Sequence, residues 1–135
     1  MSTIPYLHFQ GQCAEALAFY AQALGGTDLA LMRYRDGPDA PEAWKSSDRV
    51  MHGQVTLGAG TLMASDFPPD HEGDPQKAVS VMQTLPTPEA SRAAFDRLSE
   101  GGAVIQPFGP TFFSPGFGMV KDRFGTHWII SSEPR

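Results

Sequence analysis

The sequence predicts an α+β fold built from two βαβββ modules, each with a four-stranded sheet and one helix on one of its faces. The two halves of the chain show the same order of a strand, a helix and three further strands, judged from hydrophobic periodicity and from glycine and proline breaks. Ala18-Phe19 precedes Gly25-Gly26 by the same distance as Ala94-Phe95 precedes Gly101-Gly102, an offset of 76 residues. Such self-similarity predicts a duplicated structural unit.

The last strand of each half provides a third observation. Gly60-Thr61 opens one and Gly125-Thr126 opens the other, an offset of 65 residues. The difference between the two offsets lies mostly in a charged, proline-containing loop at 35–49 and in a linker rich in proline and acidic residues. The predicted organisation is therefore one structural domain composed of a first module at 1–66, a linker at 67–77 and a second module at 78–135.

In the first half, a helix is predicted over 13–24. Leu17, Tyr20 and Leu24 share one face at helical spacing, and Gly25-Gly26 ends the helix. Strands are predicted at 4–9, 28–34, 50–57 and 61–66.

In the second half, Thr87 suits a helix N-cap, Pro88 the first helical position and Glu89 the positive end of the helix. A strand precedes this helix at 78–85, and another begins at 104–106. The chain then closes with a hairpin whose strands contain 119–120 and 128–130, joined by a turn at 122–125.

Composition narrows the classes of function. Lys and Arg number 10 against 15 Asp and Glu, a formal net charge of −5 without a basic run, which argues against nucleic-acid binding. No apolar run approaches the ~20 residues that span a bilayer, and no signal-peptide pattern precedes Ile4. The single Cys13 excludes an internal disulfide. We expect a cytoplasmic protein with no nucleic-acid or membrane partner.

Motifs along nearly the whole chain resemble the vicinal oxygen chelate superfamily, which contains glyoxalases, extradiol dioxygenases and bleomycin or fosfomycin resistance proteins. Within it they are most similar to the PhnB-like group. The matching residues are Pro5-Tyr6-Leu7-x-Phe9, Cys13-x-x-Ala16-Leu17-x-Phe19-Tyr20, Met51-His52, Leu62-Met63-x-Ser65-Asp66 and Phe117-Gly118-x-Val120-x-Asp122-x-Phe124-Gly125-x-x-Trp128.

This resemblance implies a U-shaped cavity lined by eight strands and a homodimer whose modules are packed or exchanged between subunits. Members of the group are often labelled demethylubiquinone-methyltransferase-like. The chain has no glycine-rich loop of the adenosylmethionine-binding type, so the label does not indicate the mechanism.

Enzymes of the superfamily hold a divalent metal with His and Glu from the first and last strands of each module. The corresponding positions in this chain are Leu7 and Phe9 on the first strand and Ala64 and Ile129 on the last strands of the two modules, if these residues face the cavity. Their apolar side chains cannot bind a metal ion. We therefore expect no metal cofactor. A shift of one residue would exchange the two faces. The substitutes would then be His8, Asp66 and His127.

His52 and Gln54 are the first candidate site residues. They share a strand face with Thr56, opposite Val55 and Leu57. If that face lines the cavity, His52 is a candidate general base and both residues bind ligand. Otherwise the face meets solvent or another subunit.

Four further residues are candidates for ligand binding. Asp66 could orient a polar ligand, or could cap the turn into Pro68-Pro69. Aromatic residues could line a pocket for a flat ligand beside Met63, or could be core. These aromatic residues are Phe9, Phe117 and Trp128.

Two features leave alternatives open. Cys13 begins a helix, where a thiol can be reactive, but it also suits packing against the first strand. Trp44 in the 35–49 loop could belong to a lid over the cavity or to a dimer contact.

The function predicted from these features is binding of a small molecule in the cavity without the usual metal, by a PhnB-like protein of unknown specificity. The alternative is a divalent-metal-dependent lyase, isomerase or dioxygenase of the same superfamily, which needs three or four His, Glu or Asp on the cavity face. A purely structural dimer module is a third class. The sequence names no ligand.

Overall fold

The computed structural model describes residues 1–134 and divides into two compact units, Met1–Pro75 and Gln76–Arg135. The division falls inside the predicted linker at 67–77. Both units have the predicted βαβββ order. Within residues 1–134, no helix combines the length and the apolar character that crossing a membrane requires.

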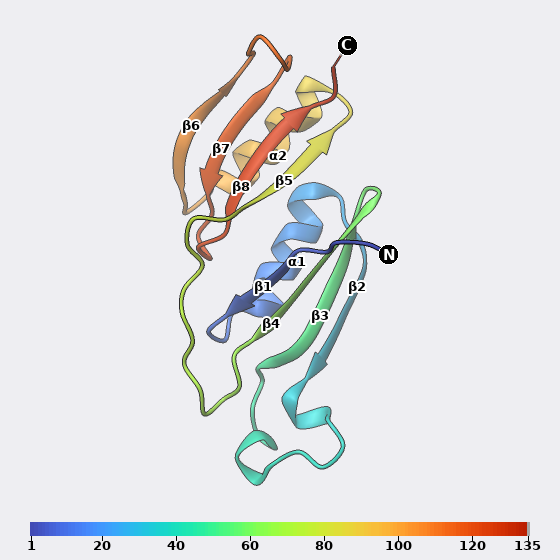
Figure 1. The fold of residues 1–135 in the computed structure, drawn as a ribbon, viewed down its shortest axis with the longest axis vertical. Coiled ribbons are helices and arrows are strands. Elements are labelled where there is room, and N and C mark those ends of the chain that lie inside the picture. Colours follow the sequence, from blue (N-terminus) through green and yellow to red (C-terminus); the bar gives the residue numbers. More distant parts are fainter. Residues whose placement is uncertain (135) are drawn as a thin grey trace. The chain divides into compact units, whose positions relative to one another are not determined.

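The first unit is a four-stranded sheet with one helix against one face (Figure 1). Its strands lie in the order β1-β4-β3-β2, with β1 parallel to β4 and the other pairs antiparallel. The loop after β2 contains two short 3-10 helices, η1 and η2. The bounds are β1 Tyr6–Phe9, α1 Cys13–Leu24, β2 Thr27–Arg33, η1 Tyr34–Asp36, η2 Glu42–Trp44, β3 Val50–Leu57 and β4 Gly60–Asp66.

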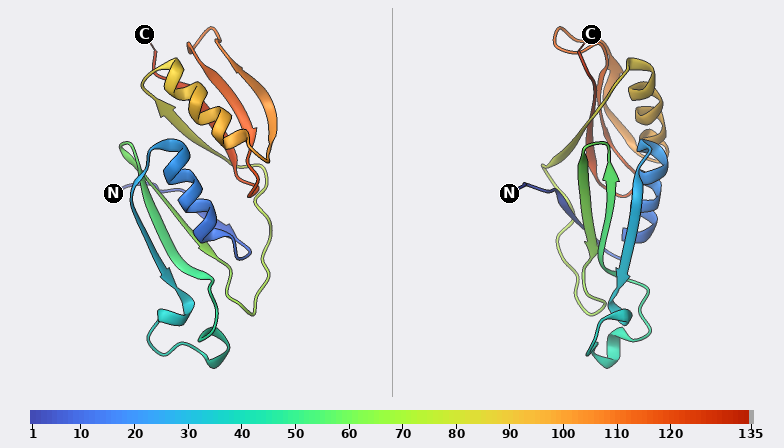
Figure 2. Two further views of the ribbon diagram at one scale, coloured as in Figure 1. Left: turned by 180° about the vertical axis from the view of Figure 1, so that it is seen from behind. Right: turned by 90° about the vertical axis from the view of Figure 1, so that its right-hand side faces the viewer.

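The second unit repeats this design with the strand order β5-β8-β7-β6. The predicted cap of its helix is confirmed, since the Thr87 hydroxyl accepts a hydrogen bond from the Ala90 N–H. Figure 2 shows that each helix covers one face of its own sheet and leaves the other face open. The bounds are β5 Ser80–Leu85, α2 Pro88–Ser99, β6 Ala103–Gly109, β7 Phe117–Lys121 and β8 His127–Ser132.

Glycine allows close approach of helix and sheet at matching positions in the two units. A Cβ on Gly53 in β3 would lie 2.7 Å from Leu17 of α1, and a Cβ on Gly118 in β7 would lie 2.7 Å from Phe95 of α2. The two glycines are 65 residues apart (118 − 53), the offset that the sequence predicts. Any larger residue at either position would displace the helix that covers the core.

The predicted offset is one residue too small for the last strands. Gly53 pairs with Ala64, whereas Gly118 pairs with Ile130, so β4 and β8 are offset by 66 residues (130 − 64). The extra residue lies in the turn between β7 and β8, where Gly125 takes a left-handed φ of 93°. A glycine in a turn is a poor marker of register because turns of different lengths use it alike.

Candidate functional site: the open face of the first sheet

The face of the first sheet that α1 leaves uncovered carries a group of polar and aromatic side chains. Gly53 and Ala64 point towards α1, so the residues on either side of them point away from it. Register places Tyr6 beside Met63 and His8 beside Ser65 on that same face. The open face therefore presents Tyr6, His8, His52, Gln54, Met63 and Ser65.

The facing expected for the first strand is wrong and must be corrected. Leu7 and Phe9 lie on the helix side of β1, 7% and 3% exposed, and Ala64 lies there too. The opposite face of β1 is the open one, and it carries Tyr6 and His8. A strand of four residues with large side chains on both faces gives no alternation from which its facing can be predicted.

Hydrogen bonds join three of these side chains into one group. The Tyr6 hydroxyl lies 3.0 Å from His52 Nδ1, and His52 Nε2 lies 3.2 Å from Gln54 Oε1. Next to this group, Ser65 Oγ lies 3.2 Å from His8 Nδ1. His52 and Gln54 thus share the open face, as their alternation predicts, and Tyr6 is the partner that sequence analysis missed.

The rings on this face form a continuous series. Successive centroids are 5.7 Å apart from His52 to Tyr6 and 5.3 Å apart from Tyr6 to His8. His8 stacks on Phe67 at 5.2 Å and an interplanar angle of 19°, and Phe67 meets His71 edge-on at 5.8 Å. Phe67 and His71 fall in the predicted linker, where no periodicity marks them. The series offers apolar ring surface beside hydrogen-bonding groups, the combination found in small-molecule sites.

Asp66 lies inside the first unit and is not on this face. It is 1% exposed, and both of its oxygens are occupied by backbone donors. Oδ1 accepts hydrogen bonds from the N–H groups of Gly11 and Cys13 at 2.8 and 2.9 Å, and Oδ2 accepts one from Val50 at 2.8 Å. The carboxylate therefore ties the start of α1 and the start of β3 to the end of β4.

The aromatic candidates divide between core and surface. Trp128 is completely buried, and its ring N–H donates a hydrogen bond of 2.9 Å to Asp122 Oδ2. Phe9 is buried under α1. Phe117 lies on the open face of the second sheet, paired with Ser131, and its ring is 5.1 Å from that of Phe113. Phe9 and Trp128 thus occupy the core, the alternative that the sequence left open.

The open face of the second sheet differs in chemistry from that of the first. At the positions that correspond to Tyr6, His52, Gln54 and Met63, it carries apolar side chains. These are Met82, Phe117, Met119 and Ile129. Duplication has preserved the scaffold but not the polar group, which belongs to the first unit.

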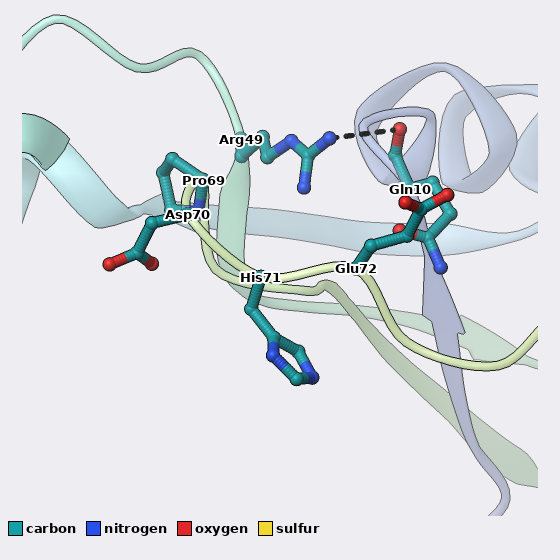
Figure 3. A pocket seen from close by; sticks show the side chains of 6 residues that line it. All are labelled: Gln10, Arg49, Pro69, Asp70, His71 and Glu72. Carbon is teal, nitrogen blue, oxygen red and sulfur yellow. Dashed lines mark hydrogen bonds between the residues drawn. The ribbon is translucent and has the colours of Figure 1, made fainter.

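A polar pocket of about 550 Å³ lies beside the linker of the first unit (Figure 3). Arg49 donates hydrogen bonds to the carbonyls of Phe67 and Pro68 at 3.1 and 3.3 Å and to that of Gln10 at 3.4 Å. The guanidinium of Arg49 therefore holds the start of the linker in place through hydrogen bonds. The pocket is lined by Gln10, Arg49, Pro69, Asp70, His71 and Glu72.

Trp44 packs against its own unit. Its ring meets Tyr34 edge-on at 4.9 Å, and its N–H lies 3.4 Å from Asp70 Oδ1. These contacts connect the 35–49 loop to the linker.

Cys13 is buried and its thiol is held in the protonated form. Burial, aided by the negative charge of Asp66, raises the pKa of Cys13 from 9.0 to about 12, against the opposing effect of Arg33. A thiol at the start of a helix is reactive only when its thiolate forms, so Cys13 is suited to packing and not to nucleophilic chemistry.

The pKa of Cys13 gives the protein a pH-dependent stability. The unfolded chain releases this proton above its pKa of 9.0, whereas the folded chain retains it up to about 12. The stabilisation is complete below the unfolded pKa and is lost as the pH rises towards the folded one. Between about pH 9 and 10, we expect the wild type to lose roughly 1 kcal/mol more than Cys13→Ala, measured by urea unfolding. Parallel pH profiles would contradict the shift.

Within the first unit, the metal ligands that a shift of one residue would offer are not gathered on the open face, because His8 lies there and Asp66 does not. Both ring nitrogens of His52 have hydrogen-bond partners, and the oxygens of Asp66 are occupied in the interior. His127, whose Nδ1 is buried without a hydrogen-bond partner, belongs to the second unit. Among residues 1–134, no group of three or more His, Cys, Asp or Glu is arranged to hold a metal ion.

The paired βαβββ units define a class of protein, the glyoxalase/bleomycin-resistance type of α+β fold. A glyoxalase/bleomycin resistance protein from Albidiferax ferrireducens T118 has the same fold at 14% identity and a TM-score of 0.63, covering 98% of this chain and all of that one. A family model described as 3-demethylubiquinone-9 3-methyltransferase matches residues 1–131, and the chain belongs to that family.

Relatives of known sequence or structure match nearly the whole chain. The crystal structure of protein PA1353 from Pseudomonas aeruginosa is 37% identical, with a TM-score of 0.88 over 98% of each chain. Protein YjdN of Escherichia coli K12 is 29% identical over 97% of this chain and 95% of its own length. A putative 3-demethylubiquinone-9 3-methyltransferase, PhnB protein, from Bacillus cereus is 24% identical, with a TM-score of 0.76 over 98% of this chain and all of that one. The chain is thus a member of the family of that model, of unknown specificity, with the fold of glyoxalase/bleomycin resistance proteins.

Proposed function

We propose that the protein binds a small, flat molecule on the open face of its first sheet, without a divalent metal. The observation that carries this proposal is the Tyr6–His52–Gln54 hydrogen-bonded group beside the ring series that ends at His71. These side chains lie away from the core under α1. Contacts between polar side chains that are exposed or part-buried contribute little to stability, so the convergence of these side chains on one face is better explained by recognition.

Binding explains the donor set better than metal-assisted catalysis does. The polar atoms of this face are amide, hydroxyl and imidazole groups already joined to one another, and Met63 lies between Tyr6 and Gln54 in the sheet register. Such a surface offers apolar contact and a few directed hydrogen bonds, which is how proteins hold uncharged ring compounds.

The test is a thermal-shift screen of flat aromatic compounds together with Ni²⁺, Zn²⁺, Mn²⁺ and Fe²⁺. A ligand that binds the folded state at about 100 times its Kd stabilises it by about 2.7 kcal/mol, so a binder raises Tm by several degrees. We expect His52→Ala to abolish that shift while leaving the Tm of the free protein within about 2 °C. The matched control Gln22→Ala, exposed on α1, should retain the full shift.

Two results would contradict the proposal. A compound whose shift persists in His52→Ala binds elsewhere. A metal-induced shift that disappears in His52→Ala, with about one metal per chain in the purified protein, would support the metal-dependent lyase, isomerase or dioxygenase instead.

The proposal extends to assembly and compartment. Each sheet has an edge strand with exposed apolar side chains, Leu29, Leu31 and Met32 in β2 and Val104 and Ile105 in β6, and a second copy of the chain would cover such edges. Light scattering should then give twice the 14.6 kDa of one chain, and a monomer would contradict it. A cytoplasmic location is supported by the single unpaired Cys13 and would be checked by fractionation.

A further inference from the structure

The direction of each hydrogen bond in the Tyr6–His52–Gln54 group follows from its atoms. Gln54 Oε1 can only accept, so the proton of this bond lies on His52 Nε2. A neutral imidazole carries one N–H, which leaves Nδ1 as an acceptor. Nδ1 therefore receives the hydroxyl proton of Tyr6. With its proton engaged, Tyr6 Oη has only lone pairs to offer a ligand.

We propose that Gln54 fixes the Nε2–H tautomer of His52, so that Tyr6 meets the ligand as a hydrogen-bond acceptor and the site selects flat molecules that carry an O–H or N–H group. This inference rests on the proposed function and adds the class of ligand to it. Gln54 acts here as a positioning residue, because it reaches the ligand's donor only through His52 and Tyr6.

The surroundings of Tyr6 favour a ring-shaped ligand with its donor on the ring edge. Tyr6 is 41% exposed, so its hydroxyl and part of its ring are open to a ligand. The His8 ring lies 5.3 Å away and continues the apolar surface towards Phe67. A ligand lying on these rings would place an O–H or N–H group of its ring edge next to Tyr6 Oη and donate a hydrogen bond to it. Methylation of that group would remove the hydrogen bond.

Reversing the Gln54 amide would reverse the whole group. The amide nitrogen would then donate to His52 Nε2, Nδ1 would carry the proton, and the Tyr6 hydroxyl would be free to donate. The site would select ligands with an acceptor. The two arrangements therefore differ in a measurable tautomer and in the ligand they prefer.

The first experiment measures the tautomer of His52 in the free protein by two-bond ¹H–¹⁵N NMR at about pH 8, above the ordinary range of imidazole titration. We expect a protonated Nε2 in the wild type and in Gln54→Glu, whose carboxylate can only accept. Gln54→Leu removes the acceptor and should give a mixture of tautomers. A protonated Nδ1 in the wild type, or an unchanged tautomer in Gln54→Leu, would overturn the proposal.

The second experiment compares 2-naphthol with its ether 2-methoxynaphthalene, two flat probes that differ in the donor. We expect the wild type to bind 2-naphthol about fivefold more tightly, the ratio that one neutral hydrogen bond produces. The ratio should approach one in Tyr6→Phe, which keeps the ring and removes the acceptor. Equal affinities in the wild type, a ratio that survives in Tyr6→Phe, or binding of neither probe would overturn the ligand class.

These outcomes separate the inference from the proposed function. If the compounds of the thermal-shift screen bind through His52 but its Nδ1 carries the proton, the inference fails and the function stands. If no shift depends on His52, the function fails, whatever the tautomer.

Discussion

Replacing Asp66 by alanine is expected to lower the free energy of unfolding of the first unit by about 4 kcal/mol. The carboxylate accepts hydrogen bonds from three backbone N–H groups, two at the entry to α1 and one at the start of β3. Each N–H left unpaired in a dry interior costs about 1–3 kcal/mol, and water entering the vacated space recovers part of that cost. Because a small domain has only about 5–15 kcal/mol of stability, the loss is large.

The measurement uses the two tryptophans, one in each unit. Trp44 lies in the first unit and Trp128 in the second. In a Trp128→Phe background, the tryptophan fluorescence followed during urea unfolding therefore comes from the first unit alone. Asp66→Asn keeps one acceptor oxygen but turns an amide donor towards a backbone N–H, and should cost about 2–3 kcal/mol. The exposed Asp74→Asn is the control, with a change below about 0.5 kcal/mol.

If Asp66→Asn kept the stability of the wild type but lost ligand binding, Asp66 would be a ligand-binding residue. The expected result instead assigns the residue to the scaffold. Its acidic side chain at the end of β4 is a sequence feature that suits either role. The choice was decided by residues 11, 13 and 50, whose N–H groups surround it.

The fold was predictable because its signals are local and repeated. The α1 bounds of Cys13–Leu24 match the prediction, since helical spacing and two glycines define that segment. The order of elements was predictable in both units because the spacing of apolar residues distinguishes helices from strands along each half of the chain. The facing of β1 and the extra residue before β8 were not predictable, because a four-residue strand and a turn carry too little pattern.

The facing of the candidate site residues was predictable where the alternation of the strand is long. His52 and Gln54 lie in an eight-residue strand whose helix-side residues from Gly53 to Leu57 are all buried, so their facing was clear. Tyr6 and Phe67 were not found, because the ring series joins β1 to the linker through contacts between residues 59 positions apart (67 − 8). The tautomer that we propose for His52 is still less visible in sequence, since it depends on a hydrogen bond and not on a residue type.

In the second unit, replacing Asp122 by alanine is expected to lower the free energy of unfolding by about 3–4 kcal/mol. The sequence places this aspartate in the predicted turn at 122–125, and its side chain also reaches the core. Oδ1 accepts hydrogen bonds from the N–H groups of Phe124 and Thr126 at 2.8 and 3.0 Å, and Oδ2 accepts the ring N–H of Trp128 at 2.9 Å. One buried carboxylate thus closes the turn and accepts the hydrogen bond of the Trp128 ring, the largest of the fully buried side chains.

The turn and the tryptophan can be separated experimentally. Trp128→Phe removes the ring N–H and part of the ring while the turn bonds remain, so it should cost less than Asp122→Ala, about 2 kcal/mol. Circular dichroism follows the unfolding of both variants, and Asp96→Ala, on the exposed side of α2, should change stability by less than about 0.5 kcal/mol. If Asp122→Ala were as mild as Asp96→Ala, the turn would hold without its carboxylate. The large cost expected here would show that Asp122 holds Trp128 in place within the core of the second unit.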